Sequence, residues 1–387
     1  MSDWQVQSIG EVCKRVTSGG TPLTSRADFY LNGTIPWLKT KEINQRRIHS
    51  TENCITELGV QNSSAKMVPI DTVTVAMYGD GQTAGRVGLT KIPLTTNQAC
   101  CNLIIDEELA DPEFVFYLLR GAYDELVARK TGSGQQNLNA RLIKSFEFSA
   151  PPIDEQRAIA STLACLDHKI DLLHRQHQTL EAMSETLFRQ WFLESENEGW
   201  DEKPLSSIAN FLNGLACQKY PAANDVDKLP VLKIRELSNG ITDSADWATS
   251  QVKPDYIVAA GDVIFAWSAS LMVKVWDGEM CVLNQHLFKV TSRDFPKWFY
   301  LRWCKHHLAE FIAISASQAT TMGHIKRGDL DAAMVLVPPP HVLETMSLQM
   351  TPLLDKQIEI ARQRKTLEKL RDTLLPKLMS GEVRVAC

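Results

Sequence analysis

Basic and amide side chains gather in polar stretches of both halves of the chain, and their types suggest a chemistry. Lys39-Thr40-Lys41 and Asn97-Gln98 lie in the first half, and Lys233-Ile234-Arg235 and Asn284-Gln285 lie in the second. Lys and Arg can bind phosphate or guanine, and Asn and Gln can pair with the edge of adenine. Taken singly, such stretches are usually solvated loops. Their recurrence at matched places favours DNA binding.

The candidate DNA-binding residues come from these stretches and from the polar segments near them. They are Lys39, Lys41, Tyr78, Gln82, Arg86, Asn97, Gln98, Ser133, Gln135, Asn137, Lys233, Arg235, Trp267, Ser268, Lys274, Asn284, Gln285, Gln318, Thr320, Thr321, His324 and Lys326. The basic pair Arg46-Arg47 is interpreted as another polar loop of the same kind.

Motifs for catalysis are missing from the sequence. The glycine-rich segment 79–86 has the wrong spacing for a phosphate loop and carries Arg86 where Lys is needed. It is better interpreted as a turn between strands whose amides could meet a phosphate. No Asn/Asp-Pro-Pro-Tyr/Phe sequence is present to hold a flipped base for methylation. His306-His307 is a poor metal pair, because neighbours on a helix face different ways. We therefore expect no catalytic residue, no metal and no cofactor.

The elements that position these side chains are duplicated. Residues 36–43 (PWLKTKEI) correspond to 230–237 (PVLKIREL), and 166–170 (LDHKI) correspond to 354–358 (LDKQI). The matches keep one order at a separation of about 190 residues, which indicates a tandem duplication. Each unit runs from a mixed region to a Pro-Pro pair and then to a long helical run. A length of 387 residues suits two such domains.

The helical runs carry apolar seams. In the first run, apolar residues at steps of three and four continue from Ile159 to Trp191, interrupted by His177 and Ser184. In the second run, Pro352 predicts a kink or a helix start near Thr351. The run is expected to end at Pro376 and Gly381. The predicted helix-pairing seam consists of Ile159, Leu163, Leu166, Ile170, Leu173, Leu180, Leu187, Leu354, Ile358, Leu367, Leu370 and Leu374.

A single apolar seam is more often the buried face of an ordinary core helix. Here the first run has about 39 residues, against a mean helix of about 11–12 residues, and it is duplicated. Two long helices with single seams most simply bury them on each other. They can run antiparallel because a globular domain lies between them in the chain.

The globular halves are predicted to be α+β domains with a mainly antiparallel or mixed sheet. Matched β-rich segments and amphipathic helical segments support this interpretation. The expected strands are 73–77, 101–105 and 146–148 in the first half and 263–267, 286–290 and 334–337 in the second, with helices at 112–129 and 296–314.

Composition limits the class of protein. The net charge is −5, so any DNA binding must come from local patches and not from an overall basic chain. Nine irregularly placed cysteines without a Cys-x-x-Cys argue for reduced thiols and against a disulfide frame or a zinc ribbon. The N-terminus has no signal pattern and no apolar stretch reaches membrane-spanning length, so we expect a cytoplasmic protein.

With these motifs in order, the chain resembles the specificity subunit of a type I restriction-modification enzyme over its full length. The resemblance rests on the doubled plan, on 151–156 (PPIDEQ), on 166–170, on 317–325 (SQATTMGHI) and on 374–383 (LLPKLMSGEV). The chain departs from the family at 338–345 (PPPHVLET), where a Glu-Gln pair is missing after the prolines.

The resemblance implies a fold and a set of partners. The fold is α+β, with two tandem, pseudo-two-fold related target-recognition domains separated by two long antiparallel helices that form a coiled coil. The expected divisions are 1–152 for the first target-recognition domain, 153–196 for the first spacer helix, 197–338 for the second domain and 339–387 for the second spacer helix with the C-terminal tail. The implied partners are double-stranded DNA, two methyltransferase subunits docked on the helices and, through them, a restriction subunit.

The resemblance also implies that each domain reads one half of a split DNA site in the major groove, while the helices act as a ruler. A helix of about 39 residues would be about 58 Å long. Two other classes stay open. One is an interaction scaffold of repeated domains on a coiled-coil spine that binds protein or carbohydrate. The other is a self-contained DNA methyltransferase, which the missing base-holding motif disfavours.

Overall fold

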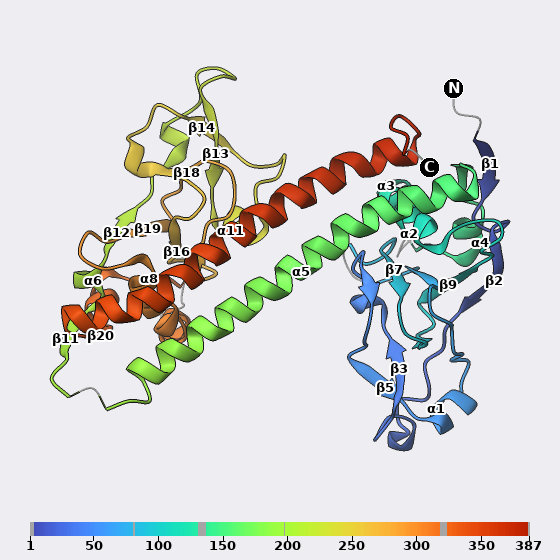
Figure 1. Ribbon diagram of the computed structural model, residues 1–387, viewed down its shortest axis with the longest axis horizontal. Coiled ribbons are helices and arrows are strands. Elements are labelled where there is room, and N and C mark those ends of the chain that lie inside the picture. Colours follow the sequence, from blue (N-terminus) through green and yellow to red (C-terminus); the bar gives the residue numbers. More distant parts are fainter. Residues whose placement is uncertain (1–3, 80–81, 131–136, 197, 318–322, 386–387) are drawn as a thin grey trace. The chain divides into compact units, whose positions relative to one another are not determined.

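A computed structural model describes residues 4–79, 82–130, 137–196, 198–317 and 323–385 (Figure 1). The chain divides into two compact units. Unit 1 consists of residues 1–168 and 368–387, and unit 2 consists of residues 169–367. Each unit therefore contains a globular part and one portion of each of the two long helices.

Unit 1 is an α+β domain whose elements alternate along the chain. Its strands are β1 (Gln5–Ser8), β2 (Cys13–Ser18), β3 (Ile35–Leu38), β4 (Arg47–Ile48), β5 (Asn53–Ile55), β6 (Val73–Ala76), β7 (Val87–Thr90), β8 (Thr95–Thr96), β9 (Cys100–Ile105) and β10 (Glu147–Ala150). Its helices are η1 (Ala27–Phe29), η2 (Thr40–Glu42), α1 (Glu57–Gln61), α2 (Pro112–Gly121), α3 (Tyr123–Ala128) and α4 (Ala140–Lys144).

Three sheets organise unit 1. A mixed sheet has the order β2-β9-β6-β7-β4, a second has the order β5-β3-β8, and β1 pairs with β10. Helix α2 begins at Pro112, where the Asp111 side chain accepts a hydrogen bond from the Phe114 amide at 2.9 Å. Its buried side chains, including Phe114 and Leu119, share one hydrophobic core with the mixed sheet and with Ile159 of the first long helix.

Unit 2 repeats this plan. Its strands are β11 (Asp201–Pro204), β12 (Asn210–Asn213), β13 (Lys228–Leu232), β14 (Trp247–Thr249), β15 (Ile257–Val258), β16 (Val263–Ala266), β17 (Met272–Val275), β18 (Cys281–Leu283), β19 (Leu287–Thr291) and β20 (Met334–Val337). Its helices are α6 (Leu205–Ile208), η3 (Cys217–Lys219), α7 (Ile234–Asn239), η4 (Pro254–Tyr256), α8 (Lys297–His306), α9 (Leu308–Ser317) and α10 (Arg327–Ala332).

The sheets of unit 2 have the orders β12-β19-β16-β17, β14-β13-β18-β15 and β11-β20. Aromatic residues of α8 dominate its core, since Trp298, Phe299 and Trp303 pack with Phe188 and Phe192 of the first long helix. The strands expected in both halves are confirmed to within a residue or two. The two expected helices are each observed as two shorter ones, α2 with α3 and α8 with α9.

The two long helices are α5 (Ile153–Phe192) and α11 (Pro340–Met379), with 40 residues each. Of the kink or helix start expected near Thr351, the helix start is wrong, because α11 begins at Pro340, where proline's missing N–H is no loss. Pro352 and Pro376 both lie within the helix. Both are exposed, so water can satisfy the carbonyl that each leaves free four residues earlier. The helix ends at Met379, shortly before Gly381 with φ +73°.

The start of α5 explains one motif of the sequence. Gln156 is buried; its side-chain oxygen accepts the Asp111 amide at 3.0 Å and its amide donates to the Pro151 carbonyl at 2.9 Å. Buried Glu155 accepts Arg384 Nη2 at 2.7 Å and Trp4 Nε1 at 3.3 Å. The acidic and amide residues after the prolines thus join the helix to the first domain and to the C-terminal tail of unit 1.

Most predicted seam positions lie on the buried side of the long helices. Ile159, Leu163, Ile170, Leu173 and Leu354 are buried. The partly buried members are Leu166, Leu180, Leu187, Ile358, Leu367 and Leu374. Leu370 does not belong to this side, because 44% of it is exposed. Among the described residues, we find no helix with the length and apolar character needed to span a membrane.

Candidate nucleic-acid interface

Each unit contains a pair of parallel strands that end at the same edge. In unit 1, β3 pairs with β8, and in unit 2, β13 pairs with β18. The Asn97 amide donates to the Leu38 carbonyl at 2.9 Å, and the Asn284 amide donates to the Leu232 carbonyl at 3.2 Å. Because parallel strands present their carboxyl ends together, this edge brings Lys39 beside the Asn97-Gln98 turn, and the matched residues of unit 2 follow the same plan.

In both units a loop that contains glycine packs closely against the Asn-Gln turn, which is Asn97-Gln98 in unit 1 and Asn284-Gln285 in unit 2. A Cβ on Gly19 would lie 2.1 Å from the Thr96 carbonyl oxygen, and a Cβ on Gly214 would lie 2.2 Å from the Asn284 carbonyl oxygen. Only glycine allows so close an approach of two backbones. The loops carry Thr21 and Gln218 to the edge, so each unit builds it from three separate segments of the chain.

The edge in unit 1 is lined by aromatic and amide groups. Lys39 Nζ lies 5.0 Å from the centre of the Trp37 ring, and Trp37 Nε1 donates to the Gly20 carbonyl at 3.0 Å. The Thr21 hydroxyl donates to Oε1 of Gln98, and the Tyr78 hydroxyl donates to the Gln98 carbonyl at 3.2 Å. These contacts bring predicted residues Lys39, Tyr78 and Gln98 together around an exposed amide.

The edge in unit 2 forms a cavity of about 290 Å³. Its lining contains the four predicted residues Lys233, Arg235, Asn284 and Gln285, together with Gln218, Ile234 and His286. Lys233 pairs with Asp246, and the hydrogen bond and charge of Lys233 hold the pKa of that carboxyl below its usual value. Arg235 pairs with the buried Glu236 at 2.7 Å. The cations are thus oriented by acids while 57% of the Arg235 side chain stays exposed.

A histidine and an aromatic ring extend the edge of unit 2. His286 Nδ1 lies 3.2 Å from the Ser268 hydroxyl, and the ring centre of Trp267 lies 6.0 Å from that of His286. His324 also lies near Trp267, with 6.1 Å between their ring centres, and its backbone bridges to Ser268. Three more predicted residues, Trp267, Ser268 and His324, therefore adjoin the cavity through His286.

Other predicted residues have contacts of their own. Lys41 forms an exposed ion pair with Glu52, and Lys274 Nζ donates to the Leu237 carbonyl at 3.1 Å. The Gln82 carbonyl accepts the Tyr123 hydroxyl at 2.8 Å. Arg86 and Asn137 are half-buried, and Lys326 is exposed at the N-cap of α10. The predictions for Ser133, Gln135, Gln318, Thr320 and Thr321 fall outside the described residues.

Four residues of the two edges are not among those predicted from the sequence: Thr21, Trp37, Gln218 and His286. His286 could have been found, because it directly follows the matched Asn-Gln pair. Thr21 follows Gly19, and Gln218 follows Gly214. The role of these glycines is recognisable only once their close backbone contacts are known, so the sequence alone did not indicate Thr21 and Gln218.

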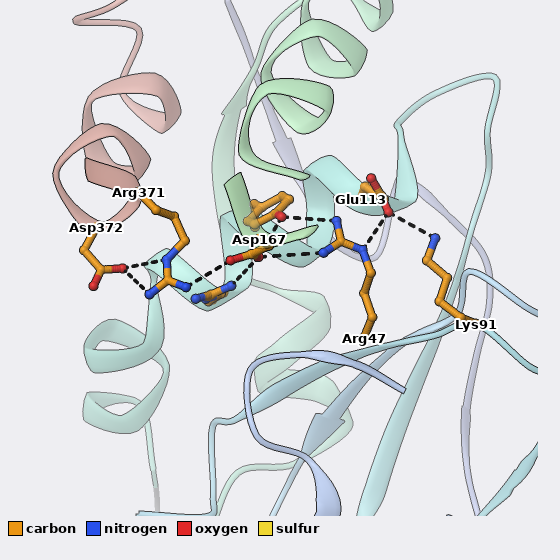
Figure 2. A network of polar contacts seen from close by, with 8 residues as sticks. Arg47, Lys91, Glu113, Asp167, Arg371 and Asp372 are labelled. Atoms are coloured by element: carbon orange, nitrogen blue, oxygen red, sulfur yellow. Dashed lines mark hydrogen bonds and ion pairs between the residues drawn. The ribbon is translucent and has the colours of Figure 1, made fainter. Parts of the chain in front are cut away.

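One interpretation was wrong: Arg47 is no DNA-facing loop residue. Its side chain is 3% exposed and donates to Glu113 Oε1 at 3.1 Å and to the Tyr117 hydroxyl at 3.1 Å (Figure 2). Lys91 completes this group by pairing with Glu113 at 3.0 Å. Despite the cost of burial, these two cations hold the pKa of Glu113 below its usual value.

Asp167 of α5 is the centre of this polar cluster in unit 1 (Figure 2). It accepts hydrogen bonds from the Tyr117 hydroxyl at 2.8 Å, Arg120 Nη1 at 2.8 Å and Arg371 Nη1 at 2.9 Å. Burial alone would raise the pKa of Asp167, but the charge of Arg120 and the bonds from Tyr117 and Arg371 lower it. The carboxylate therefore joins α2, α5 and α11 within this unit.

Unit 2 has a similar cluster around Glu181 of α5. Arg302 donates to both of its carboxylate oxygens at 2.9 Å, and Lys305 donates at 2.7 Å. Arg302 also donates to the hydroxyl of Ser184, one of the polar interruptions of the seam, at 3.0 Å. In both units, two residues three apart on a domain helix hold an acid of α5.

The described residues contain no group of three or more His, Cys, Asp or Glu side chains that could hold a metal ion. His307 is used internally, since its Nε2 lies 3.0 Å from the Met334 carbonyl. The arrangement provides hydrogen-bonding amides, cations and rings at two exposed edges, which suits recognition of a polar, negatively charged ligand.

The two units match one family. The model of the type I restriction modification DNA specificity domain matches residues 1–182 and 197–369. The chain therefore belongs to this family, whose members are the DNA-recognition subunits of restriction-modification enzymes and not their catalytic subunits. The resemblance inferred from the sequence motifs is confirmed.

Relatives and a solved structure agree with this assignment. The chain is 27% identical over 413 residues to the type I restriction enzyme MjaIX specificity subunit of Methanocaldococcus jannaschii, covering 99% of this chain and 94% of that protein. It is 23% identical over 420 residues to the MjaVIII specificity subunit of the same organism, covering 99% and 93%. The crystal structure of a type I restriction-modification system S subunit from M. genitalium has the same fold, with a TM-score of 0.64, 15% identity and coverage of 97% and 96%.

Proposed function

We propose that this specificity subunit reads a bipartite DNA site, one half with the domain of residues 1–152 and the other with the domain of residues 197–338. The observation that carries the proposal is the repetition of one three-segment edge in both units, with Lys39 and Gln98 in one and Lys233 and Gln285 in the other. Lysine can neutralise phosphate and glutamine can read a base edge, so each edge combines both kinds of contact.

The long helices are proposed to pair as an antiparallel coiled coil that sets the spacing between the half-sites. Support comes from each unit separately. In unit 1, Leu163 and Leu375 belong to one hydrophobic core, and in unit 2, Phe188 and Met350 do. A helix of 40 residues is about 60 Å long. One DNA turn is about 34–36 Å, so the half-site centres should be one to two turns apart.

The same helices are proposed to dock two methyltransferase subunits and, through them, a restriction subunit, in the cytoplasm where the host DNA lies. Apolar side chains on their outer sides support a docking role. Leu348 of α11 is 76% exposed, and Met183 of α5 is 48% exposed. Each of these side chains offers apolar surface that a bound partner subunit could remove from water.

A domain exchange tests the proposal of independent readers. Residues 1–150 are replaced by the matching domain of another specificity subunit, and the chain is co-expressed with its methyltransferase partners. Mapping of methylated bases should show one half of the recognised sequence changed and the other retained. A change in both halves would contradict independent reading.

A helix-length variant tests the ruler. One turn is inserted into α5 after His168 and into α11 after Leu367, where the two units divide. This adds about 5.4 Å, so the unread spacer should grow by about one or two base pairs while both half-sites stay intact. An insertion of the same length after Gly240, where a Cβ would meet nothing within 4 Å, is the control. An unchanged spacer in the helix variant would refute the ruler.

The scaffold alternative predicts a different binding behaviour. A DNA reader loses affinity steeply as salt rises, because bound phosphates release counterions. Titration of the assembled complex with its methylated-site duplex at several salt concentrations separates the two. Binding to protein or carbohydrate, without salt-dependent DNA binding, would favour the scaffold.

A further inference from the structure

The Asn-Gln pair at each edge contains one side chain that faces the protein and one that does not. Asn97 Oδ1 accepts the Ala99 amide at 3.2 Å and the Cys100 thiol at 3.1 Å. Asn284 is 3% exposed, and its Oδ1 accepts the His286 amide at 3.3 Å. An Asn oxygen that accepts the amide two residues later fixes a turn. Both asparagines are therefore engaged in shaping the backbone.

The glutamine that follows is presented outward in both units. Gln98 is exposed, and Gln285 is half-buried at the cavity. Thr21 holds Oε1 of Gln98 through one lone pair, which leaves a second lone pair and the two N–H groups of that amide. Gln285 Nε2 lies 3.4 Å from His286 Nε2, and its Oε1 accepts no hydrogen bond from the described residues. Each amide is oriented by a neighbour and keeps bonding capacity in the direction of solvent.

The open groups match one base edge. In the major groove adenine offers the N7 acceptor and the N6 donor, and a carboxamide satisfies both at once with an N–H and its oxygen. Guanine offers two acceptors there, which a carboxamide cannot meet in that way. Each edge also contains a cation, Lys39 in unit 1 and Lys233 in unit 2, so the glutamine can approach a base while the lysine contacts the backbone or a guanine.

We infer that Gln98 and Gln285 are the adenine-reading residues of the two half-sites, and that Asn97 and Asn284 position them. This inference rests on the proposed function, since it assigns base contacts within the two edges. His286 is the neighbour that orients the second reader, as Thr21 and Tyr78 are for the first, and Gln218 lines the same cavity as Gln285.

Methylation mapping with the full chain and its methyltransferase partners tests the inference. Gln98→Ala should relax one A·T pair in one half-site, and Gln285→Ala should relax one A·T pair in the other. At that position the preference for adenine should fall on the order of 10- to 100-fold, the range for loss of a bidentate contact. Every other position should keep its preference.

Matched controls are available in each unit. Gln61 and Gln251 are exposed glutamines that take part in none of the edge contacts described above, and their alanine variants should leave the recognised sequence unchanged. Gln98→Lys and Gln285→Lys should shift the same position towards guanine, because lysine pairs with the guanine acceptors.

The inference is overturned if the glutamine variants keep the wild-type sequence, or if they relax a G·C pair instead. It is also overturned if each single variant alters both half-sites. A wild-type complex that methylates no bipartite sequence would instead refute the proposed function, so the two failures are distinguishable.

Discussion

Replacing Asp167 with Asn should destabilise unit 1 strongly. The carboxylate is 10% exposed and accepts three hydrogen bonds, two of them from arginines. Asn has nearly the same shape but no charge, so the cations of Arg120 and Arg371 would lose their buried counter-charge. Removing one partner from a buried ion pair costs about 3–5 kcal/mol. Because the Asn side chain can still accept the hydrogen bond from Tyr117, we expect the unfolding free energy to fall by about 3 kcal/mol.

Asp372 provides a matched control. It pairs with the same Arg371 at 2.8 Å, but its side chain is 62% exposed. Exposed pairs contribute about 0–1 kcal/mol, so Asp372→Asn should have little effect. Urea unfolding of the full chain measures both variants, and hydrogen exchange in α2 locates the loss in unit 1. Equal destabilisation by the two substitutions would refute the reasoning from burial.

The effect of Asp167 should depend on pH in a defined direction. Its folded pKa lies below the ordinary 3.8, so the stabilisation is complete above that value and is lost as the pH falls through the folded pKa. The difference in unfolding free energy between wild type and Asp167→Asn should therefore be constant near neutral pH and shrink below about pH 4. A difference that grows towards acid pH would contradict the lowered pKa.

Three further predictions concern unit 2. Glu181→Gln should destabilise it by about 2 kcal/mol in urea unfolding, less than for Asp167 because 29% of the side chain is exposed; no change would contradict the role of Arg302. Lys233→Ala should lower the slope of log affinity for DNA against log salt by about 1 if the lysine contacts phosphate; an unchanged slope would exclude that contact. Gly214→Ala should abolish reading of one half-site in methylation mapping, because its Cβ would lie 2.2 Å from the Asn284 carbonyl, whereas Gly328→Ala meets nothing within 4 Å and should be neutral.

Strands and domain helices could be predicted from the sequence because their signals are local. Runs such as 73–77 and 263–267 combine β-branched and apolar residues, and both are buried strands. The duplication also pointed to Lys233, Arg235, Asn284 and Gln285, which line one cavity. Residues of the same types stand at matched strand ends in both units, so these positions could be predicted without a structure.

Features that depend on distant partners could not be predicted. Arginine is usually exposed, so nothing near Arg47 in the sequence indicated that Glu113 and Tyr117 would bury it. The helix start near Thr351 was wrongly expected because prolines usually end helices, while Pro352 and Pro376 lie on an exposed side that tolerates them. The asparagine and the glutamine of each pair face different ways, and this difference could not be predicted without the folded backbone.

The main-chain bonds that hold each Asn-Gln turn have a consequence for how such proteins change. The Asn97 and Asn284 amides bond to carbonyls of the neighbouring strand, and the glycine loops close against the turn through backbone atoms. These contacts use backbone atoms, which every amino acid has. The residues at the tips of the turns, Gln98 and Gln285, can therefore change while the backbone contacts remain. With Gln98 and Gln285 as the proposed base readers, a mutation at the tip should change the methylation pattern of the host in a single step and leave the supporting backbone contacts in place.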